Sequence, residues 1–155
     1  MDIIDHMDNP GIAVRPLVAS DRAGWLPLWH GYLDFYRESL DPEVTEHTFT
    51  RLCERREGMF GFVADSGGEV VGIVNALLHP STWSMTSYCY LEDLFVSPAA
   101  RGRDVARLLI EAVSHEARAL GAAHVYWHTQ EFNGPARSLY DQVARLTSMR
   151  VYERR

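Results

Sequence analysis

Two adjacent carboxylates, Glu92 and Asp93, interrupt the otherwise apolar run YCYLEDLFV at residues 88–96. A run of this kind predicts a strand that is covered on both faces, as in the middle of a sheet. Carboxylates are costly there unless they are paired or serve a purpose such as binding a cation or moving a proton. In a regular strand the two side chains would point to opposite faces, and a β-bulge would change that arrangement. The pair is therefore either a functional site or a structural ion pair with an arginine.

A second group of candidate residues lies in the loop that contains Arg101, Gly102 and Arg103. The helix predicted from Asp104 onward would point its free N–H groups and the positive end of its dipole at this loop. Glycine allows close approach of the backbone and the arginines add positive charge, so the segment suits a phosphate or pyrophosphate. It is neither a Walker loop nor a GxGxxG loop. The alternative is an ordinary strand-to-helix connection with surface arginines.

Asn133, Ala136 and Tyr140 form a third group, spaced so that they lie along one face of a predicted helix. Asn133 is a suitable N-terminal cap, and Pro135 fits the first turn. Taken alone, Tyr140 would be interpreted as a buried packing residue. Cys89, inside the predicted strand, is interpreted as a small core residue rather than a nucleophile.

Residues 90–109 (YLEDLFVSPAARGRDVARLL) resemble the acetyl-CoA-binding motif of the GNAT N-acetyltransferase superfamily. The motif is most similar to those of diamine or polyamine acetyltransferases and of bacterial histone-acetyltransferase-like members. Residues 133–140 (NGPARSLY) resemble the family's Asn-x-x-small-x-x-x-Tyr helix, and the order of predicted elements matches over residues 12–155. The resemblance implies the GNAT fold. It also implies acetyl-CoA-dependent transfer of an acetyl group to a primary amine of a small molecule or to a lysine side chain.

The resemblance further implies roles for individual residues. Glu92 would help to receive and deprotonate the amine, and Tyr140 would protonate the leaving thiolate. The cofactor acetyl-CoA would be held by residues of the strand end, the loop and the two helix starts: Leu94, Phe95, Val96, Arg101, Gly102, Arg103, Asp104, Val105, Ala106, Asn133, Ala136 and Tyr140. The acceptor amine would be bound by acidic and aromatic residues with one histidine: Trp29, Tyr36, Glu92, Asp93, Trp127 and His128. No metal ligands are expected.

Asp104 departs from the family's loop pattern Arg/Gln-x-x-Gly-x-Gly/Ala, in which Arg101 matches the first position and Ala106 the last. Its carboxylate replaces the middle glycine, at the helix end where the pyrophosphate is expected. Aspartate tolerates unusual backbone angles and caps helices, so the fold can keep it. Its charge weakens coenzyme binding unless the side chain turns away or pairs with Arg101, Arg103 or Arg107. The alternative function is therefore a catalytically weak acyl-CoA-binding module with the GNAT fold.

The hydrophobic pattern predicts a single domain over residues 1–155, with a loose lead-in at 1–11. The predicted fold class is α/β, a central mixed sheet of about six or seven strands with about four helices on its two faces. Strands are predicted at 12–17, 60–64, 69–78, 88–96, 123–129 and 149–153, with a hairpin turn at 65–68. Helices are predicted at about 20–36, 42–56, 104–120 and 133–146.

All 15 basic residues are arginine, and the net charge is −6. Residues 61–100 carry four acids and no arginine, whereas residues 101–155 carry a net charge of +3. We interpret this asymmetry as an anionic-cofactor side beside a cationic-acceptor side, against the alternative of a solvated surface. The overall acidity argues against nucleic-acid binding, and no apolar run is long enough to cross a membrane. A cytoplasmic protein is expected, and the resemblance is compatible with a homodimer that pairs residues 149–155 across its interface.

Overall fold

The structure is a computed structural model that describes residues 11–155. The lead-in expected at residues 1–11 lies outside the described residues, except for Gly11. One sheet runs in the order of the chain, antiparallel except for the parallel pair of β4 and β5. The strands are β1 (Ala13–Pro16), β2 (Met59–Ser66), β3 (Glu69–His79), β4 (Tyr88–Val96) and β5 (Val125–Tyr126). The mixed α/β class is confirmed.

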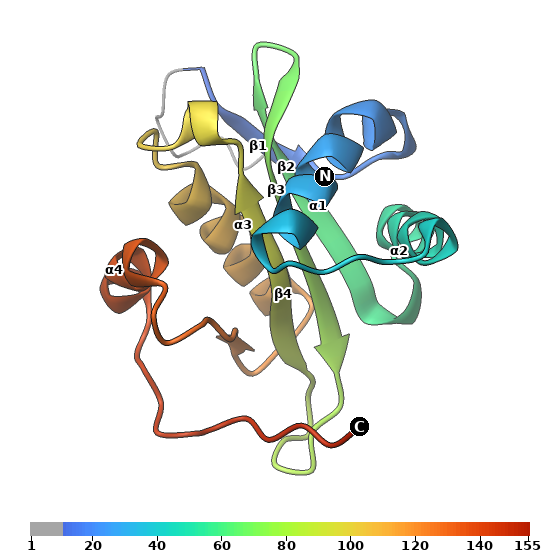
Figure 1. Cartoon of the computed structure of the whole chain (residues 1–155). Coiled ribbons are helices and arrows are strands. Elements are labelled where there is room, and N and C mark those ends of the chain that lie inside the picture. Colours follow the sequence, from blue (N-terminus) through green and yellow to red (C-terminus); the bar gives the residue numbers. More distant parts are fainter. Residues whose placement is uncertain (1–10) are drawn as a thin grey trace.

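Four α-helices accompany this sheet in the described part of the chain (Figure 1). They are α1 (Arg22–Phe35), α2 (Pro42–Glu54), α3 (Val105–Ala119) and α4 (Gly134–Val143). α1 packs on β3 and β4 and α2 packs on β2, whereas α3 packs on β2, β3 and β4 from the opposite side. The sheet is therefore the middle of three layers, as the two-faced apolar strand at 88–96 predicts.

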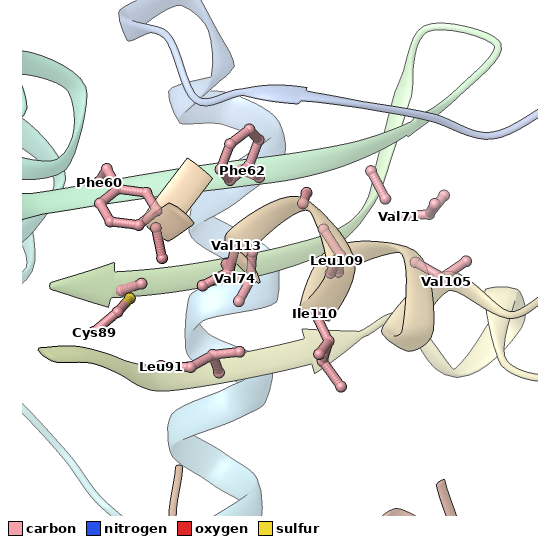
Figure 2. Close-up of a cluster of buried hydrophobic side chains, with 14 of the residues drawn as sticks. Phe60, Phe62, Val71, Val74, Cys89, Leu91, Val105, Leu109, Ile110 and Val113 are labelled. Atoms are coloured by element: carbon pink, nitrogen blue, oxygen red, sulfur yellow. The ribbon is translucent and has the colours of Figure 1, made fainter. Parts of the chain in front are cut away.

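The face of the sheet toward α3 carries the larger apolar cluster (Figure 2). Alternate residues of each strand point to it, and α3 meets them with side chains that repeat every three or four residues. Gly72 lies directly beneath the helix, because a Cβ atom there would stand 2.8 Å from Cγ1 of Val105. The close approach of α3 to β3 therefore requires glycine at this position.

The opposite face is covered by α1 and α2. Val63 and Ile73, the strand neighbours of the residues that face α3, pack here against Trp25, Trp29 and Leu52. The rings of Trp25 and Trp29 stack with centroids 5.2 Å apart. Pro27 lies inside α1, and the helix continues through it.

An aspartate precedes both α1 and α2, but only the one before α2 caps its helix through the side chain. The side chain of Asp41 accepts a hydrogen bond from the Glu43 backbone N–H at 2.8 Å and caps α2. Asp21 precedes α1 but does not cap it. Its carboxylate accepts a hydrogen bond from the Val18 backbone N–H at 2.9 Å and pairs with Arg15 at 2.8 Å. Asp21 therefore ties β1 to the start of the helix.

A β-bulge interrupts the pairing of β3 and β4 at the two acidic residues. Asn75 pairs with Asp93 and the next residue, Ala76, pairs with Leu91, so Glu92 is an extra residue on β4. Leu91 faces α3. The extra residue therefore turns Asp93 toward the side of α1 and α2, the side on which Phe95 also packs. The bulge that the sequence analysis considered is present.

The far edge of the sheet differs from the prediction. The strand expected at 123–129 is reduced to the two residues of β5, which pair only with Cys89 and Tyr90. Residues 149–153 do not form a strand, so within residues 11–155 the sheet has five strands instead of six or seven. An alternating pattern forms a strand only where a neighbouring strand is available for pairing, and the described part of the chain places no strand beyond β5. Within residues 11–155, none of the helices combines the length and the apolar character needed to span a membrane.

Candidate active site

A cavity of about 200 Å³ lies on the α1 and α2 side of the sheet, at the bulge. Its polar lining includes both predicted carboxylates, Glu92 and Asp93, with Asn75 from β3. The remaining lining comes from α1, α2, β2, β3 and the α1–α2 connection: Trp29, Leu40, Thr48, Arg51, Leu52, Met59, Ala76 and Leu77. The helical layer and the bulged strand thus enclose a small site with charged groups on apolar walls.

Asp93 is the buried carboxylate of this cavity, with 8% of its surface exposed. It accepts a hydrogen bond at 3.0 Å from Nδ2 of Asn75, the residue opposite it in the sheet. Burial raises the pKa of Asp93 to about 6, helped by the charge of Glu92 and opposed by hydrogen bonds from Asn75 and Tyr32. No arginine pairs with it among residues 11–155, so the structural ion pair considered for these acids is not formed.

Glu92 has a different environment from its neighbour. As the extra residue of the bulge it is exposed, and its backbone carbonyl accepts a hydrogen bond of 3.4 Å from the Tyr32 hydroxyl. Its carboxylate adds negative charge beside Asp93. The bulge therefore brings both acids to one cavity, with Asp93 desolvated and Glu92 in contact with water.

Tyrosines and a tryptophan at the end of α1 form an aromatic wall near these acids. The rings of Trp29 and Tyr32 stack at 5.6 Å, and Tyr36 follows at 5.0 Å from Tyr32. Burial, with a further contribution from the charge of Asp93, raises the pKa of both tyrosines above its usual range. Both phenols therefore keep their protons at neutral pH. Trp29 and Tyr36, predicted to bind the acceptor, thus lie with Asp93, and Trp29 lines the cavity itself.

Tyr140 lies on α4, packed against the cluster that faces α3. Its ring meets that of Trp127 edge to face at 5.4 Å. Burial, and then the charge of Tyr36, raises the pKa of the Tyr140 hydroxyl, so this group is a proton donor and not an anion at neutral pH. Tyr140 is thus a packing residue, as its sequence context alone predicts, and its burial keeps the hydroxyl protonated.

Trp127 and His128 do not line the cavity at the bulge. Trp127 packs with Tyr140 on the α3 side. His128 is exposed, and its Nδ1 lies 3.2 Å from the hydroxyl of Tyr90. Cys89 is fully buried in the core, where burial raises the pKa of its thiol to about 11, so it is not a nucleophile at neutral pH.

The loop before α3 has the geometry expected of an anion-binding helix start. Gly102 has a φ of +80°, and a Cβ atom added there would meet nothing within 4 Å. Asp104 has a φ of +64° and a left-handed conformation immediately before the helix. Aspartate is one of the few residues that adopts this conformation at modest cost, which explains how it replaces glycine. The first backbone hydrogen bond of the helix runs from Leu108 to Asp104, so the N–H groups before Leu108 remain available.

The charge of Asp104 is balanced by a neighbour one turn on. Nε of Arg107 lies 3.2 Å from Oδ1 of Asp104, and Nη2 of Arg107 donates at 2.7 Å to Oε1 of Gln142 in α4. Arg101 lies over the ring of Phe95 at 5.9 Å, and Arg103 donates to Ser66 at 3.3 Å. The free N–H groups, the exposed loop and the neutralised carboxylate fit a pyrophosphate, although Asp104 itself adds no attraction for it.

The predicted cofactor residues of β4 lie beyond the pairing with β5. That pairing ends at Tyr90, so Leu94, Phe95 and Val96 have no strand partner on the β5 side. α4 and the short β5 lie on this side of β4 (Figure 1). Asn133 and Ala136 lie at the start of α4, and Asn133 caps it without a side-chain hydrogen bond. Val105 and Ala106 form the first turn of α3.

Two cavity residues escaped the sequence analysis. Asn75 is the one polar residue inside the apolar run VVGIVNALL, and that isolation is a signal that could have identified it. Arg51 lies on α2 beside the half-buried Thr48 and the buried Leu52, and its position on the helix does not by itself indicate a role. Arg51 Nε and Asn75 Oδ1 are buried without a hydrogen-bond partner.

Comparison with known proteins places these features in one family. Residues 25–144 match the family described as Acetyltransferase (GNAT) family. The D-amino-acid N-acetyltransferase HPA3 of Saccharomyces cerevisiae is 34% identical over 152 residues, which cover 97% of this chain and 94% of that protein. The thialysine N-epsilon-acetyltransferase of Caenorhabditis elegans is 32% identical over 87 residues, 56% of this chain and 54% of that protein. The aminoglycoside N-acetyltransferase AAC(6')-Iy, crystallised with CoA, superposes with a TM-score of 0.81 at 18% identity, over 93% of this chain and 94% of that chain.

Proposed function

The chain belongs to the GNAT family of acetyltransferases, and we propose that it transfers the acetyl group of acetyl-CoA directly to the primary amine of a small molecule. The observation that carries this proposal is Asp93, a buried carboxylate without a cation partner in a small cavity at the bulge of β4. A positively charged amine is the ligand that such a carboxylate attracts.

Asp93 and Glu92 are proposed to receive the amine. A free alkylamine has a pKa of about 10.4, so it arrives protonated and must lose a proton before it can attack a carbonyl. A carboxylate with a pKa of about 6 is ionised at neutral pH and can accept that proton at an oxygen atom. Glu92, in contact with water, offers the route by which the proton leaves the cavity. This differs from the expectation that Glu92 is the main base, because Asp93 holds the desolvated position.

Tyr140 is proposed to supply the second proton. When bound, acetyl-CoA presents the acetyl group as a thioester whose sulfur leaves as a thiolate. The hydroxyl of Tyr140 keeps its proton at neutral pH and can donate it at the Oη atom to a leaving sulfur. The unpaired edge of β4 at Leu94–Val96 would offer backbone N–H groups to the acetyl oxygen. The loop at Arg101–Asp104 and the first turn of α3 would hold the pyrophosphate.

The size of the cavity and the relatives support a small acceptor. A volume of about 200 Å³ is below the range of roughly 300–1,000 Å³ of pockets that enclose drug-sized ligands. HPA3 and the thialysine acetyltransferase are both named for small amines. A peptide lysine is the less favoured acceptor, since only its side chain would fit.

We also propose a cytoplasmic setting and a homodimer. Cys53 and Cys89 are free thiols in the described structure, which fits a cytoplasmic setting. Large apolar side chains are exposed along the extended C-terminal residues: Leu146, Met149, Val151 and Tyr152. A second copy of the chain that covers them would form the homodimer expected from the resemblance.

The test is acetyl-CoA consumption over a panel of small amines, together with calorimetric titration of acetyl-CoA. We expect micromolar-range binding and turnover of at least one amine. Tyr140→Phe should lower kcat by at least about tenfold while changing the acetyl-CoA Kd less than threefold. Binding without turnover of any amine would favour the alternative, a binding module that keeps the fold. Absence of binding at millimolar acetyl-CoA would contradict both.

A further inference from the structure

The cavity that holds Asp93 also carries a positive charge that the proposed reaction does not use. Arg51 lines the cavity from α2, a different element from the strand β4 that supplies Asp93. An amine acceptor alone gives no reason for a guanidinium here, because a cation in the pocket repels the ammonium group. A cavity with charges of both signs therefore suits a ligand that carries both signs as well.

The hydrogen bonds of Arg51 are incomplete. Its Nη1 donates to Oε2 of Glu57 at 3.2 Å, a long contact to a carboxylate whose side chain is 66% exposed. Its Nε is buried without a partner. An arginine offers five N–H donors in a planar fork, and a buried donor without an acceptor costs free energy. The guanidinium of Arg51 thus has N–H donors that are not used within residues 11–155. A carboxylate is the group that matches the planar fork of these donors.

Arg51 and Asp93 do not satisfy one another. Among residues 11–155 the one ion pair of Arg51 is with Glu57, and the donors to the Asp93 carboxylate are Asn75 and Tyr32. The two opposite charges therefore stay separate across the cavity. The lining of the same cavity also includes apolar side chains, among them Trp29, Leu52 and Leu77. One small cavity is therefore lined by both a cationic and an anionic side chain that do not pair with each other.

We propose that Arg51 binds a carboxylate of the acceptor, so that the substrates of this enzyme are amino acids. The inference rests on the proposed acetyltransferase function and deepens it. The amine of the substrate is directed to Asp93, its carboxylate to the guanidinium of Arg51, and its carbon chain to the apolar wall. A diamine is disfavoured because its second ammonium group meets Arg51. The carboxylate of the amino acid takes no part in the bond changes, so Arg51 positions and selects the substrate.

The test compares acceptors that differ only by a carboxylate. Lysine is paired with 1,5-diaminopentane, and phenylalanine with 2-phenylethylamine, with each amino acid supplied in both enantiomers. We expect kcat/KM to be at least tenfold higher for the better enantiomer of an amino acid than for its matched amine. Equal or greater kcat/KM for the amines would overturn the inference and leave the acetyltransferase function intact.

Arg51→Met tests the residue itself. Loss of a charge-assisted pair should reduce kcat/KM for amino acids roughly 10- to 100-fold, mainly through KM. The value for 2-phenylethylamine should change less than threefold, and the value for 1,5-diaminopentane should rise, because its second ammonium group no longer meets a like charge. Arg51→Lys should recover part of the preference, because it keeps the charge without the fork. A variant that affects amino acids and amines equally would show a structural role only and would contradict the inference.

Two controls and a binding measurement complete the design. Glu57→Gln removes the ion-pair partner of Arg51 but leaves the guanidinium, so the preference for amino acids should persist. Arg56→Met removes an arginine that pairs with Glu54 outside the cavity and should change nothing. Calorimetry on the CoA-loaded protein gives an answer without turnover: lysine should bind and 1,5-diaminopentane should not. Equal binding would overturn the inference, and failure of all turnover would count separately against the proposed function.

Discussion

Asp93 occupies a position that costs the folded protein stability. Its carboxylate is desolvated, and its compensation comes from neutral donors, Asn75 Nδ2 and the Tyr32 hydroxyl, instead of from a cation. Such an arrangement is typical of sites that trade stability for function. The cost has a definite pH dependence, because it depends on the ionised form of the side chain.

Asp93→Asn should stabilise the protein at high pH. In the unfolded chain the pKa of an aspartate is about 3.9, so between about pH 4 and 6 the folded state holds more protons and the free energy of unfolding falls as pH rises. A difference of about two pKa units corresponds to about 3 kcal/mol at pH 8. Urea unfolding should show a gain of about 1–3 kcal/mol for the variant at pH 8 and little change at pH 4. Destabilisation at pH 8 would contradict the assignment of the buried charge.

The same residue should control the pH dependence of catalysis. kcat/KM is expected to fall as the pH drops through about 6, where Asp93 becomes protonated and can no longer accept a proton. Asp93→Asn should lower kcat/KM by at least about 100-fold at pH 8, and the matched variant Glu92→Gln by much less. A pH-rate profile of the wild type with steady-state kinetics of both variants provides the check. A larger loss for Glu92→Gln would return the main role to Glu92.

At the scale of the elements, local chemistry predicted the helices and the hairpin closely. α3 and its terminating Gly121, the start of α2 at Asp41-Pro42, and the turn at 65–68 all follow from short-range signals in the sequence. The two-residue length of β5 does not, because it depends on how far β4 stays within pairing distance. The sequence did not identify Arg51 as a cavity residue, because its surroundings also depend on how the elements pack. A helical pattern indicates which face of α2 is apolar, and only the packed structure indicates what Arg51 faces.

The start of α3 depends on one polar chain that joins two helices. Asp104 pairs with Arg107, which also bonds to Gln142 on the helix that carries Tyr140. The structure thus neutralises the carboxylate that departs from the family's loop pattern. We expect Arg107 to have two effects. It neutralises the charge of Asp104, and its hydrogen bond to Gln142 helps to position α4.

A double-mutant cycle separates these duties. Arg107→Met should weaken CoA binding at least about threefold, because the charge of Asp104 is then uncompensated. Asp104→Gly should bind CoA at least as tightly as the wild type, since glycine adopts the same left-handed conformation. In the Asp104→Gly background, Arg107→Met should have little further effect on the calorimetric Kd. An undiminished effect there would assign Arg107 to α4, which Gln142→Ala would then reproduce.

At the scale of the whole molecule, charge and exposed apolar surface are unevenly distributed. The basic surplus begins at Arg101, where the proposed coenzyme loop starts, and the four acids of residues 61–100, a segment without arginine, include the pair at the bulge. The charge distribution of the sequence therefore predicts an anion-binding side beside a cation-binding side. It did not indicate that α2 contributes a cation to the acidic side.

The exposed apolar residues after α4 lead to an expectation about assembly. If residues 145–155 lie between two copies of the chain, removing them should convert a dimer into a monomer. Sedimentation velocity of the full chain and of a chain that ends at Ala144 should show this change. The truncated chain should keep its unfolding temperature within a few degrees, because these residues contribute no buried side chain. A monomeric full chain would refute the dimer and would leave the fold unaffected.

The bulge at Glu92 puts the two halves of β4 in opposite phase. Before it, the even-numbered Tyr90 points away from α3 while Leu91 points toward it, and after it the odd-numbered Asp93 and Phe95 point away. The strand thus depends on the presence of a residue at position 92 more than on its identity. Any side chain there should allow folding, whereas deletion of Glu92 would exchange the two faces from 93 to 96 and place Asp93 in the apolar core. The fold should therefore tolerate substitution of residue 92 but not its deletion.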